Sequence, residues 1–176
     1  MKVFWLLPLL LLPLLLSAQN NKLKSGIGAL KSGEYADAIS RFDGIILQSS
    51  KPDERAEAHY YRAESYVKLY QEALHHKNQA QMIALSDAYV RASEDYARAA
   101  ELNKNAWQEN AGKELLKLYP ELVRDGLQKL ENAKKEKAPE NISVLLSNAA
   151  RVLGVAAAQQ PQQYLPADLL GQIAME

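Results

Sequence analysis

An amphipathic stretch between Gly33 and Leu47 restricts this chain to a narrow set of folds. Its apolar residues recur at steps of three and four positions, as they do along one face of an α-helix. They are Tyr35, Ala38, Ile39, Phe42, Ile45 and Ile46. Ser32-Gly33 separates the stretch from a shorter apolar stripe formed by Leu23, Ile27 and Leu30. A helix, a tight turn and a second amphipathic helix form a hairpin that cannot bury its apolar face alone, so further helices are expected to pack against it.

The rest of the chain predicts helices of the same kind. Glycine and proline number only 8 and 7, alanine is frequent, and no stretch alternates with period two, so the expected fold class is all-α without a sheet. After the first hairpin, helices are predicted at about 52–74, 83–99, 107–118, 120–130, 139–156 and 166–174. Ser50 is expected to cap the helix that begins at Pro52, and Pro120 is expected to open a new helix. Residues 76–80 are predicted to form the tip of a long helical hairpin; the alternative is a separate helix capped by Ser86-Asp87.

The first eighteen residues predict a secretory signal peptide. Met1-Lys2 supplies a basic start, Val3 to Leu16 is an unbroken run of apolar residues and prolines, and Ser17-Ala18 offers small residues for a signal peptidase. A membrane anchor is the rival interpretation, but the run is shorter than the about 20 residues that span a bilayer, and Pro8 and Pro13 interrupt it. The ending LLLSAQN resembles signal peptides common in Bacteroidetes-type bacteria. Cleavage near Ala18, a periplasmic or secreted location and no membrane insertion after cleavage are therefore expected.

Composition argues against several classes of function. The chain has 21 basic and 21 acidic residues, so no general attraction to nucleic acid or anionic lipid is expected. It has no cysteine, which excludes disulfides and thiolate chemistry. His75 and His76 are adjacent and would point about 100° apart on a helix, and His59 is distant, so no metal site is expected. The acidic residues Glu57, Glu64, Glu72 and Asp95 show no acid–base pairing and are predicted to be surface charges. The sequence therefore predicts neither an enzyme nor a bound cofactor.

Small and aromatic residues recur in three successive units. Gly26 precedes Gly33-Glu34-Tyr35-Ala36-Asp37-Ala38 and Phe42; the run from Ala56 to Tyr66 leads to Ala92 and Tyr96; Trp107 and Ala111 lead to Val123 and Leu127. This pattern resembles the tetratricopeptide repeat (TPR), a helix pair of roughly 34 residues with W-x₂-L-G-x₂-Y in its first helix and A-x₃-F in its second. In unit two, His59 stands in the tryptophan position and Ala63 in the glycine position. The extra length of this unit is explained either by two longer helices or by a projecting hairpin with a contact surface.

The resemblance implies antiparallel helical hairpins stacked as a short TPR-like α-solenoid. The repeats would span 19–134, in units of about 20–52, 53–104 and 105–135, and residues 139–176 would form C-terminal capping helices. In that family the first helices line a concave groove that binds peptides. The groove positions carried over from the resemblance are Ile27, Lys31, Tyr60, Glu64, Lys68, Asn105 and Gln108, accompanied by Leu23, Val67 and Leu115. The alternative is a groove filled by the chain's own C-terminal tail, through Tyr164, Leu165 and Leu169.

The predicted function is that of an exported scaffold that binds a protein or peptide partner in the cell envelope, without catalysis. The alternative is a structural subunit of an envelope complex that self-associates as a homo-oligomer, through the long hairpin or through the alanine-rich helix at 139–156.

Overall fold

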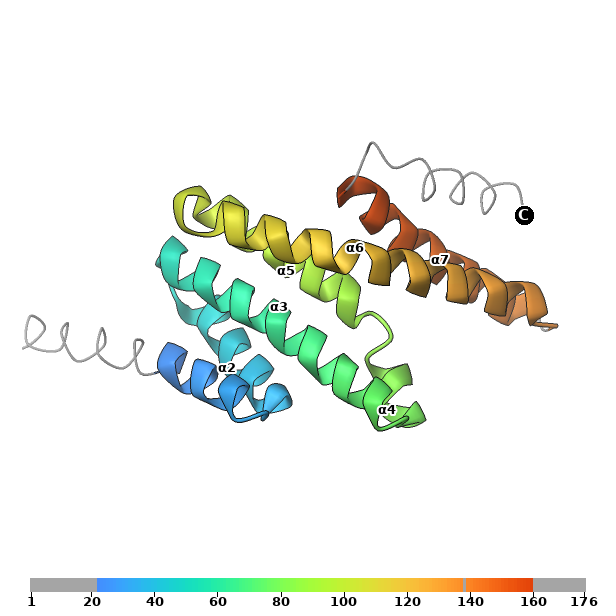
Figure 1. Cartoon of the computed structure of the whole chain (residues 1–176), viewed down its shortest axis with the longest axis horizontal. Helices are drawn as coiled ribbons and strands as arrows, with labels where there is room; N and C mark the ends of the chain where they lie inside the picture. The colour runs from blue at the N-terminus through green and yellow to red at the C-terminus, as the bar shows by residue number, and fades with distance from the viewer. Residues whose placement is uncertain (1–21, 138, 160–176) are drawn as a thin grey trace, which may run out of the picture.

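The computed structural model describes residues 22–137 and 139–159, which are helical apart from short connections (Figure 1). Residues 22–31 belong to the first helix. The labelled helices are α2 (Tyr35–Gln48), α3 (Pro52–His75), α4 (Gln79–Ala84), α5 (Ala88–Leu102), α6 (Lys104–Lys135) and α7 (Pro139–Gln159). No strand occurs within these described ranges, which confirms the all-α prediction.

Several sequence predictions fall on parts of the chain outside the described residues. They are the signal peptide at 1–18, its cleavage near Ala18, the helix at 166–174 and the tail that carries Tyr164, Leu165 and Leu169. Among the helices within the described ranges, none has both the length and the apolar character needed to cross a membrane.

The turn predicted at Ser32-Gly33 is present and closes the first helix. Gly33 has φ +82°, a left-handed conformation that favours glycine. The amide of Glu34 donates to the carbonyl of Ala29 (2.9 Å) and that of Gly33 to the carbonyl of Leu30 (3.2 Å). These paired bonds are the Schellman arrangement, which satisfies carbonyls that the ending helix leaves free. The turn of the first hairpin therefore depends on Gly33, which adopts the left-handed conformation that ends the first helix.

The start of α3 differs from the prediction in its cap. Lys51, not Ser50, occupies the cap position, and no side chain caps the helix. The hydroxyl of the neighbouring Ser49 makes the hydrogen bonds at this helix start. Its Oγ accepts from the amide of Lys51 (3.2 Å) and donates to Glu54 Oε2 (2.8 Å). Pro52 is the first helical residue, as predicted. The serine whose hydroxyl stabilises the connection between α2 and α3 is thus Ser49, one residue before the predicted Ser50.

The long hairpin turns where the sequence indicated, but its returning arm is divided. α3 ends at His75, and Lys77 adopts a left-handed conformation at the tip (φ 51°). Asn78 then caps the short α4 by accepting from the amide of Gln81 (3.1 Å). α5 starts separately at Ala88 after Asp87, as in the alternative prediction, although the Asp87 side chain makes no cap bond. The chain therefore returns from the tip through the short α4 and then through the separate helix α5.

The two helices predicted at 107–118 and 120–130 are one continuous helix, so that prediction is wrong. Pro120 lies inside α6, on its exposed side, and does not open a helix. Proline removes one backbone donor and disfavours a helix interior. The buried stripe of α6 nevertheless runs unbroken past it, through Leu118, Leu122 and Val123. Burial of that stripe sustains the helix, so α6 is not a helix pair in itself and instead forms an antiparallel pair with α7 (Figure 1).

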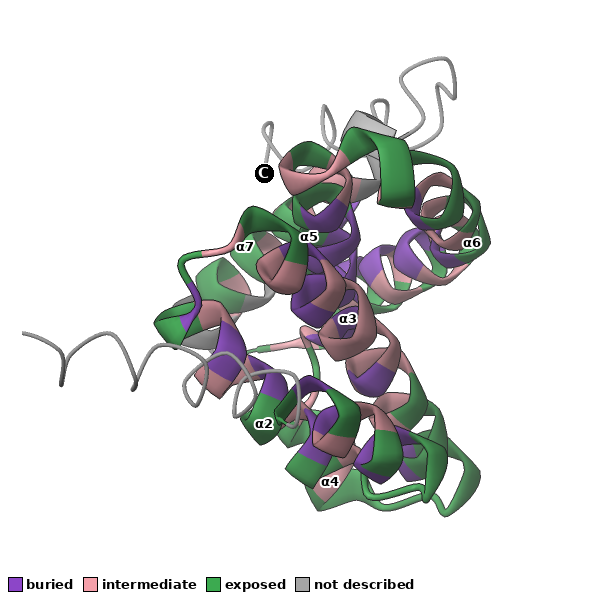
Figure 2. Cartoon of the chain, turned by 90° about the vertical axis from the view of Figure 1, so that its left-hand side faces the viewer, coloured by how far each residue is buried: buried purple, intermediate pink, exposed green. Residues whose placement is uncertain are grey.

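The long helices stack in order: α2 packs on α3, α3 on α5, α5 on α6, and α6 on α7. Figure 2 shows the buried positions gathered between helices and the exposed ones on the outer faces. The largest apolar cluster joins α3, α5, α6 and α7 through Ala63, Tyr89, Val90, Ala92, Tyr96, Ala111, Leu118, Leu122, Val123 and Val152. Smaller clusters lie at the two ends of the stack. Each long helix therefore buries one stripe against its neighbours, as the periodicity predicted, whereas the short α4 has no buried residue.

Glycines allow two of these helix pairs to approach closely. A methyl group added at Gly26 would lie 2.7 Å from Cε1 of Phe42, and one added at Gly126 would lie 2.6 Å from Cδ2 of Leu153. Both distances are far below van der Waals contact, and Phe42 and Leu153 are fully buried. In the first hairpin, a small residue and an aromatic residue of the repeat pattern, Gly26 and Phe42, thus pack directly against each other.

Candidate functional site: a cleft between α3 and α6

A cleft opens where α3 and α6 diverge above α5. Both helices pack on α5 but contact each other far less, so a hollow of about 440 Å³ remains between them. One wall comes from α3, with Tyr60, Glu64, Val67, Lys68 and Gln71, and the other from α6, with Glu114, Lys117, Leu118 and Glu121. Each set repeats at steps of three or four residues and so shares one helix face. Tyr96 of α5 lines the hollow between them.

Aromatic side chains close one end of the cleft. The ring of Tyr60 lies 4.5 Å from that of Trp107 and 5.2 Å from that of Tyr96, measured between centroids. Tyr61 meets Tyr60 edge to face at 5.5 Å. Such contacts between rings fix the side chains as well as bury them. These contacts between rings therefore hold the side chains at this end of the cleft in place.

The charged side chains of the cleft fall into paired and unpaired groups. Lys117 Nζ binds Glu114 Oε1 at 2.6 Å, and Glu121 Oε2 binds Arg124 Nη1 at 2.7 Å. Glu64 makes no hydrogen bond or ion pair within 4 Å to any residue in the described ranges. The pKa of Glu64 is raised, first by burial and then by the charge of Glu114, against the opposing charges of Lys68 and Lys117. Glu64 is thus a half-buried carboxylate whose charge the protein compensates incompletely.

The two phenols of the cleft share this electrostatic environment. Burial, followed by the carboxylates of Glu114 and Glu64, raises the pKa of Tyr60 to about 12. The same three causes raise the pKa of Tyr96 still further. Tyr96 is only 2% exposed, yet its hydroxyl forms no hydrogen bond with any residue that the structure describes. This hydroxyl is not a buried polar atom without a partner, so it reaches solvent in the cleft and is available for hydrogen bonding beside the two carboxylates.

The structure brings together some of the predicted groove residues and separates others. Tyr60, Glu64 and Lys68 line the cleft together with Val67. Ile27 and Leu23 instead pack in the first apolar cluster, and Lys31 is exposed at the end of the first helix. Asn105 and Gln108 are exposed near the start of α6 and do not line the cleft, and Leu115 packs against the main core.

Sequence reasoning missed the α6 wall because it placed the groove too early in that helix. Glu114, Lys117 and Glu121 all lie further along α6 than Gln108, and Glu114, the first of them, lies more than one turn beyond it. Their spacing of three and four residues was visible in the sequence, as was the opposite charge of neighbours along it. The predicted break at Pro120 hid the continuity of this face.

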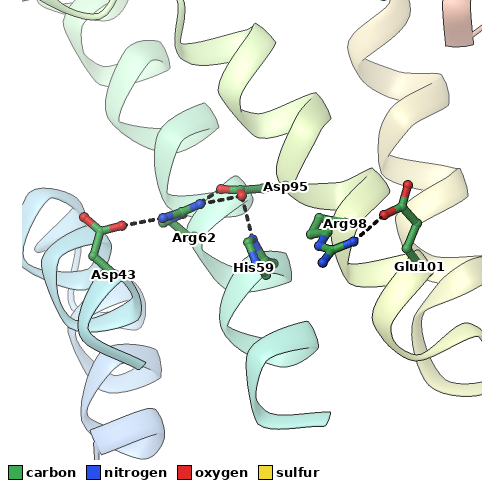
Figure 3. A network of polar contacts seen from close by, with 6 residues as sticks. All are labelled: Asp43, His59, Arg62, Asp95, Arg98 and Glu101. Atoms are coloured by element: carbon green, nitrogen blue, oxygen red, sulfur yellow. Dashed lines mark hydrogen bonds and ion pairs between the residues drawn. The ribbon is translucent and has the colours of Figure 1, made fainter. Parts of the chain in front are cut away.

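A second polar cluster lies on the other side of α3 and joins three helices (Figure 3). Asp95 of α5 accepts from Arg62 Nε (2.7 Å) and Nη2 (2.6 Å) of α3, and from Nδ1 of His59 (2.8 Å). A carboxylate only accepts, so Nδ1 of His59 is the protonated nitrogen. Arg62 Nη1 also binds Asp43 of α2. Burial lowers the pKa of Arg62, but the bonds and charges of Asp95 and Asp43 outweigh burial and raise it.

This cluster overturns the prediction that Asp95 is a surface charge. Asp95 is 5% exposed and His59 is 8% exposed. His59, at the position where the repeat pattern has tryptophan, packs inside and orients the Asp95 carboxylate. A His–Asp pair is also used in catalysis, but here both oxygens of Asp95 are already bound by Arg62 and His59 does not line the cleft. The cluster therefore links α2, α3 and α5 and constrains their relative orientation.

The remaining predicted polar sites are simpler. His75 and His76 are exposed at the tip of the hairpin, and Glu72 is exposed on α3. No set of three histidine, aspartate or glutamate side chains within the described residues is arranged to hold a metal ion.

In comparisons with known proteins, no protein-family model, no curated protein and no solved structure matches this chain.

Proposed function

We propose that this chain is an exported TPR-like helical scaffold that binds a segment of another protein in the cleft between α3 and α6, in the periplasm or outside the cell. The observation that carries the proposal is the cleft itself: about 440 Å³, walled by two helix faces with mixed charged and aromatic side chains. Peptide-binding sites on helical proteins combine such features, since aromatic groups supply contact area and charged groups supply specificity.

The order of helix packing supports a short solenoid of hairpins. Each long helix packs on the next one, and α7 covers α6 at the end of the stack, as a capping helix would. In a solenoid of this kind the first helices of successive units lie side by side, and α3 and α6 have those places in the proposed repeat. The signal-like residues 1–18 support export.

The proposal includes no catalytic step. Among the described residues that line the cleft there is no serine, cysteine or histidine, so the usual nucleophiles and the usual general base do not meet there. The lining residues suit recognition, since tyrosine offers both an apolar ring and a hydroxyl.

A pull-down with a charge-neutral pair of variants tests the proposal. The cleft variant Glu64→Ala/Lys117→Ala removes one charge from each wall. The control variant Glu72→Ala/Lys113→Ala removes the same charges from exposed positions of α3 and α6 outside the cleft. Extracts of the source cell envelope are passed over each protein, and bound proteins are quantified by mass spectrometry.

We expect at least one protein to bind to wild type and control alike and to be reduced about tenfold on the cleft variant, as loss of a charge-assisted contact implies. Circular dichroism and thermal unfolding establish that both variants are folded. Identical sets of bound proteins for all three chains would reject the cleft as the binding site.

A second candidate function, self-association as a structural subunit, is favoured by apolar side chains at the hairpin tip. Ile83 is 74% exposed and Leu74 39% exposed, and both lie beside hollows that Met82 and Tyr70 also line. Isolated apolar side chains are common on surfaces, but adjacent ones around a hollow mark contact sites. Sedimentation equilibrium decides between the two: Ile83→Asp should abolish dimers if the tip mediates association, and a wild-type monomer at high micromolar concentration excludes this candidate.

A further inference from the structure

Two polar groups that line the cleft make no hydrogen bond or ion pair with any other described residue. The carboxylate of Glu64 lacks an ion-pair partner among the described residues, whereas Glu114 and Glu121 each bind a neighbouring cation. The hydroxyl of Tyr96 also makes no hydrogen bond within the described ranges, and it reaches solvent in the cleft although most of its side chain is buried. Both groups line the same hollow. Both groups accept hydrogen bonds, and the carboxylate also attracts a positive charge, so a ligand with a cationic N–H donor suits both.

We propose that the cleft recognises a basic side chain, arginine or lysine, on a segment of a partner protein, with its cation beside Glu64 and its aliphatic stem against Tyr60. This inference rests on the proposed function, because it specifies the chemistry of the segment that the cleft binds. The aromatic faces strengthen the assignment, since a cation is attracted to a tyrosine ring within about 6 Å of its centroid.

The balance of charges in the cleft favours a cation over an anion. Three lining residues are acidic and two are basic, and the ammonium of Lys117 is already bound to Glu114 at 2.6 Å. Lys68, the remaining cation, is exposed and keeps its water, whereas Glu64 is half-buried. Coulomb energies grow as the local dielectric falls, so two charges interact more strongly at a partly buried site than in bulk water. A ligand charge therefore gains more beside Glu64 than beside Lys68.

The same argument disfavours the chain's own tail as the occupant. Residues 160–176 contain no lysine or arginine, and they include Asp168 and Glu176. Such a segment offers no positive side chain to Glu64. The basic side chain is thus expected to come from another protein.

Three blocked heptapeptides that differ only at the central residue test the inference on the full chain. The central residue is arginine, its neutral isostere citrulline, or glutamate, and the remaining residues are alanine and glycine. Binding is followed by ¹H–¹⁵N NMR titration, which gives both the affinity and the location of the affected amides.

We expect the arginine peptide to shift amides around Glu64 and Tyr96 saturably, and the citrulline peptide to bind about tenfold more weakly, as loss of one charge-assisted contact implies. Glu64→Gln should remove this difference between the two peptides. The control Glu72→Gln, a carboxylate exposed on the same helix outside the cleft, should preserve it.

Each other outcome rejects the inference. Equal binding of all three peptides in the cleft refutes the basic preference but leaves the proposed peptide-binding function standing. Preferential binding of the glutamate peptide would assign recognition to Lys68 and Lys117 instead. Absence of any cleft shift would count against both proposals. Binding that emerges only in a Tyr164→Ala/Leu169→Ala variant would show that the tail occupies the cleft.

Discussion

Arg62 of α3 donates one hydrogen bond to each carboxylate oxygen of Asp95 in α5, with N–O distances of 2.7 and 2.6 Å. The two residues are 33 positions apart in sequence, and the pair is the central link of a polar chain that runs from Asp43 of α2 to His59. Two parallel bonds fix the relative orientation of the groups more firmly than one can. The angle between the helices that form the cleft depends on this link, because α5 supports both walls.

Removal of the Asp95 carboxylate should therefore destabilise the fold. Asp95→Ala leaves Arg62 with only Asp43 and leaves Nδ1 of His59 without its acceptor, so we expect a loss of about 3 kcal/mol in the free energy of unfolding. The control Asp37→Ala removes a solvent-exposed pair with Arg41 and should cost less than about 1 kcal/mol. Urea denaturation measures both. Comparable losses for the two variants would mean that the buried cluster adds nothing beyond a surface ion pair.

Two glycines on the first helix should respond oppositely to alanine. Gly26→Ala places a methyl group against the buried ring of Phe42 and should cost about 1–3 kcal/mol. Gly28 faces open space, so Gly28→Ala should instead stabilise the helix by about 0.5–1 kcal/mol. Thermal or urea unfolding of the two variants gives the comparison directly. A neutral Gly26→Ala variant would contradict the close packing of the first two helices.

Pro120→Ala should stabilise the protein. The substitution restores a backbone donor inside α6 and relieves the clash that proline makes with the preceding turn, for a gain of about 1–3 kcal/mol. Lys113→Ala, an exposed change in the same helix, should stay within about 0.5 kcal/mol. If Pro120 opened a separate helix, as its sequence context suggested, its replacement would be neutral or destabilising. Urea denaturation distinguishes the two cases.

Glu64→Gln should stabilise the protein near neutral pH and not in acid. The pKa of Glu64 is raised in the folded state, chiefly by burial, so the native protein holds this proton more tightly than the unfolded chain. Its favourable contribution is complete below the ordinary glutamate pKa of about 4.3 and is lost as pH rises through the raised value. The advantage of glutamine should therefore be seen at pH 7 and fade toward pH 4 in urea titrations.

Glu72→Gln provides the reference for that experiment, because Glu72 is exposed on the same helix. A stabilisation by Glu64→Gln that persisted unchanged at pH 4 would have to come from packing and not from the charge.

The sequence predicted the features that depend on neighbours within about four positions. Apolar steps of three and four residues gave the long helices, Gly33 gave the first turn, and Pro139 gave the start of α7. Four lining residues of the cleft on α3 were also identified, because they share a helix face whatever the neighbouring helix is: Tyr60, Glu64, Val67 and Lys68.

Tertiary structure alone decided the rest, because the responsible energies come from residues distant in the chain. Local sequence favours a helix start at Pro120, but burial of the stripe that passes through Leu118 and Leu122 against α5 and α7 keeps α6 continuous. Local sequence makes Asp95 a surface charge, but Arg62 and His59 compensate its burial. The second wall of the cleft follows from the first of these effects, since only a continuous α6 brings Glu114 and Glu121 opposite Glu64. Periodicity determines which face of a helix is buried, whereas packing determines which other helix that face meets.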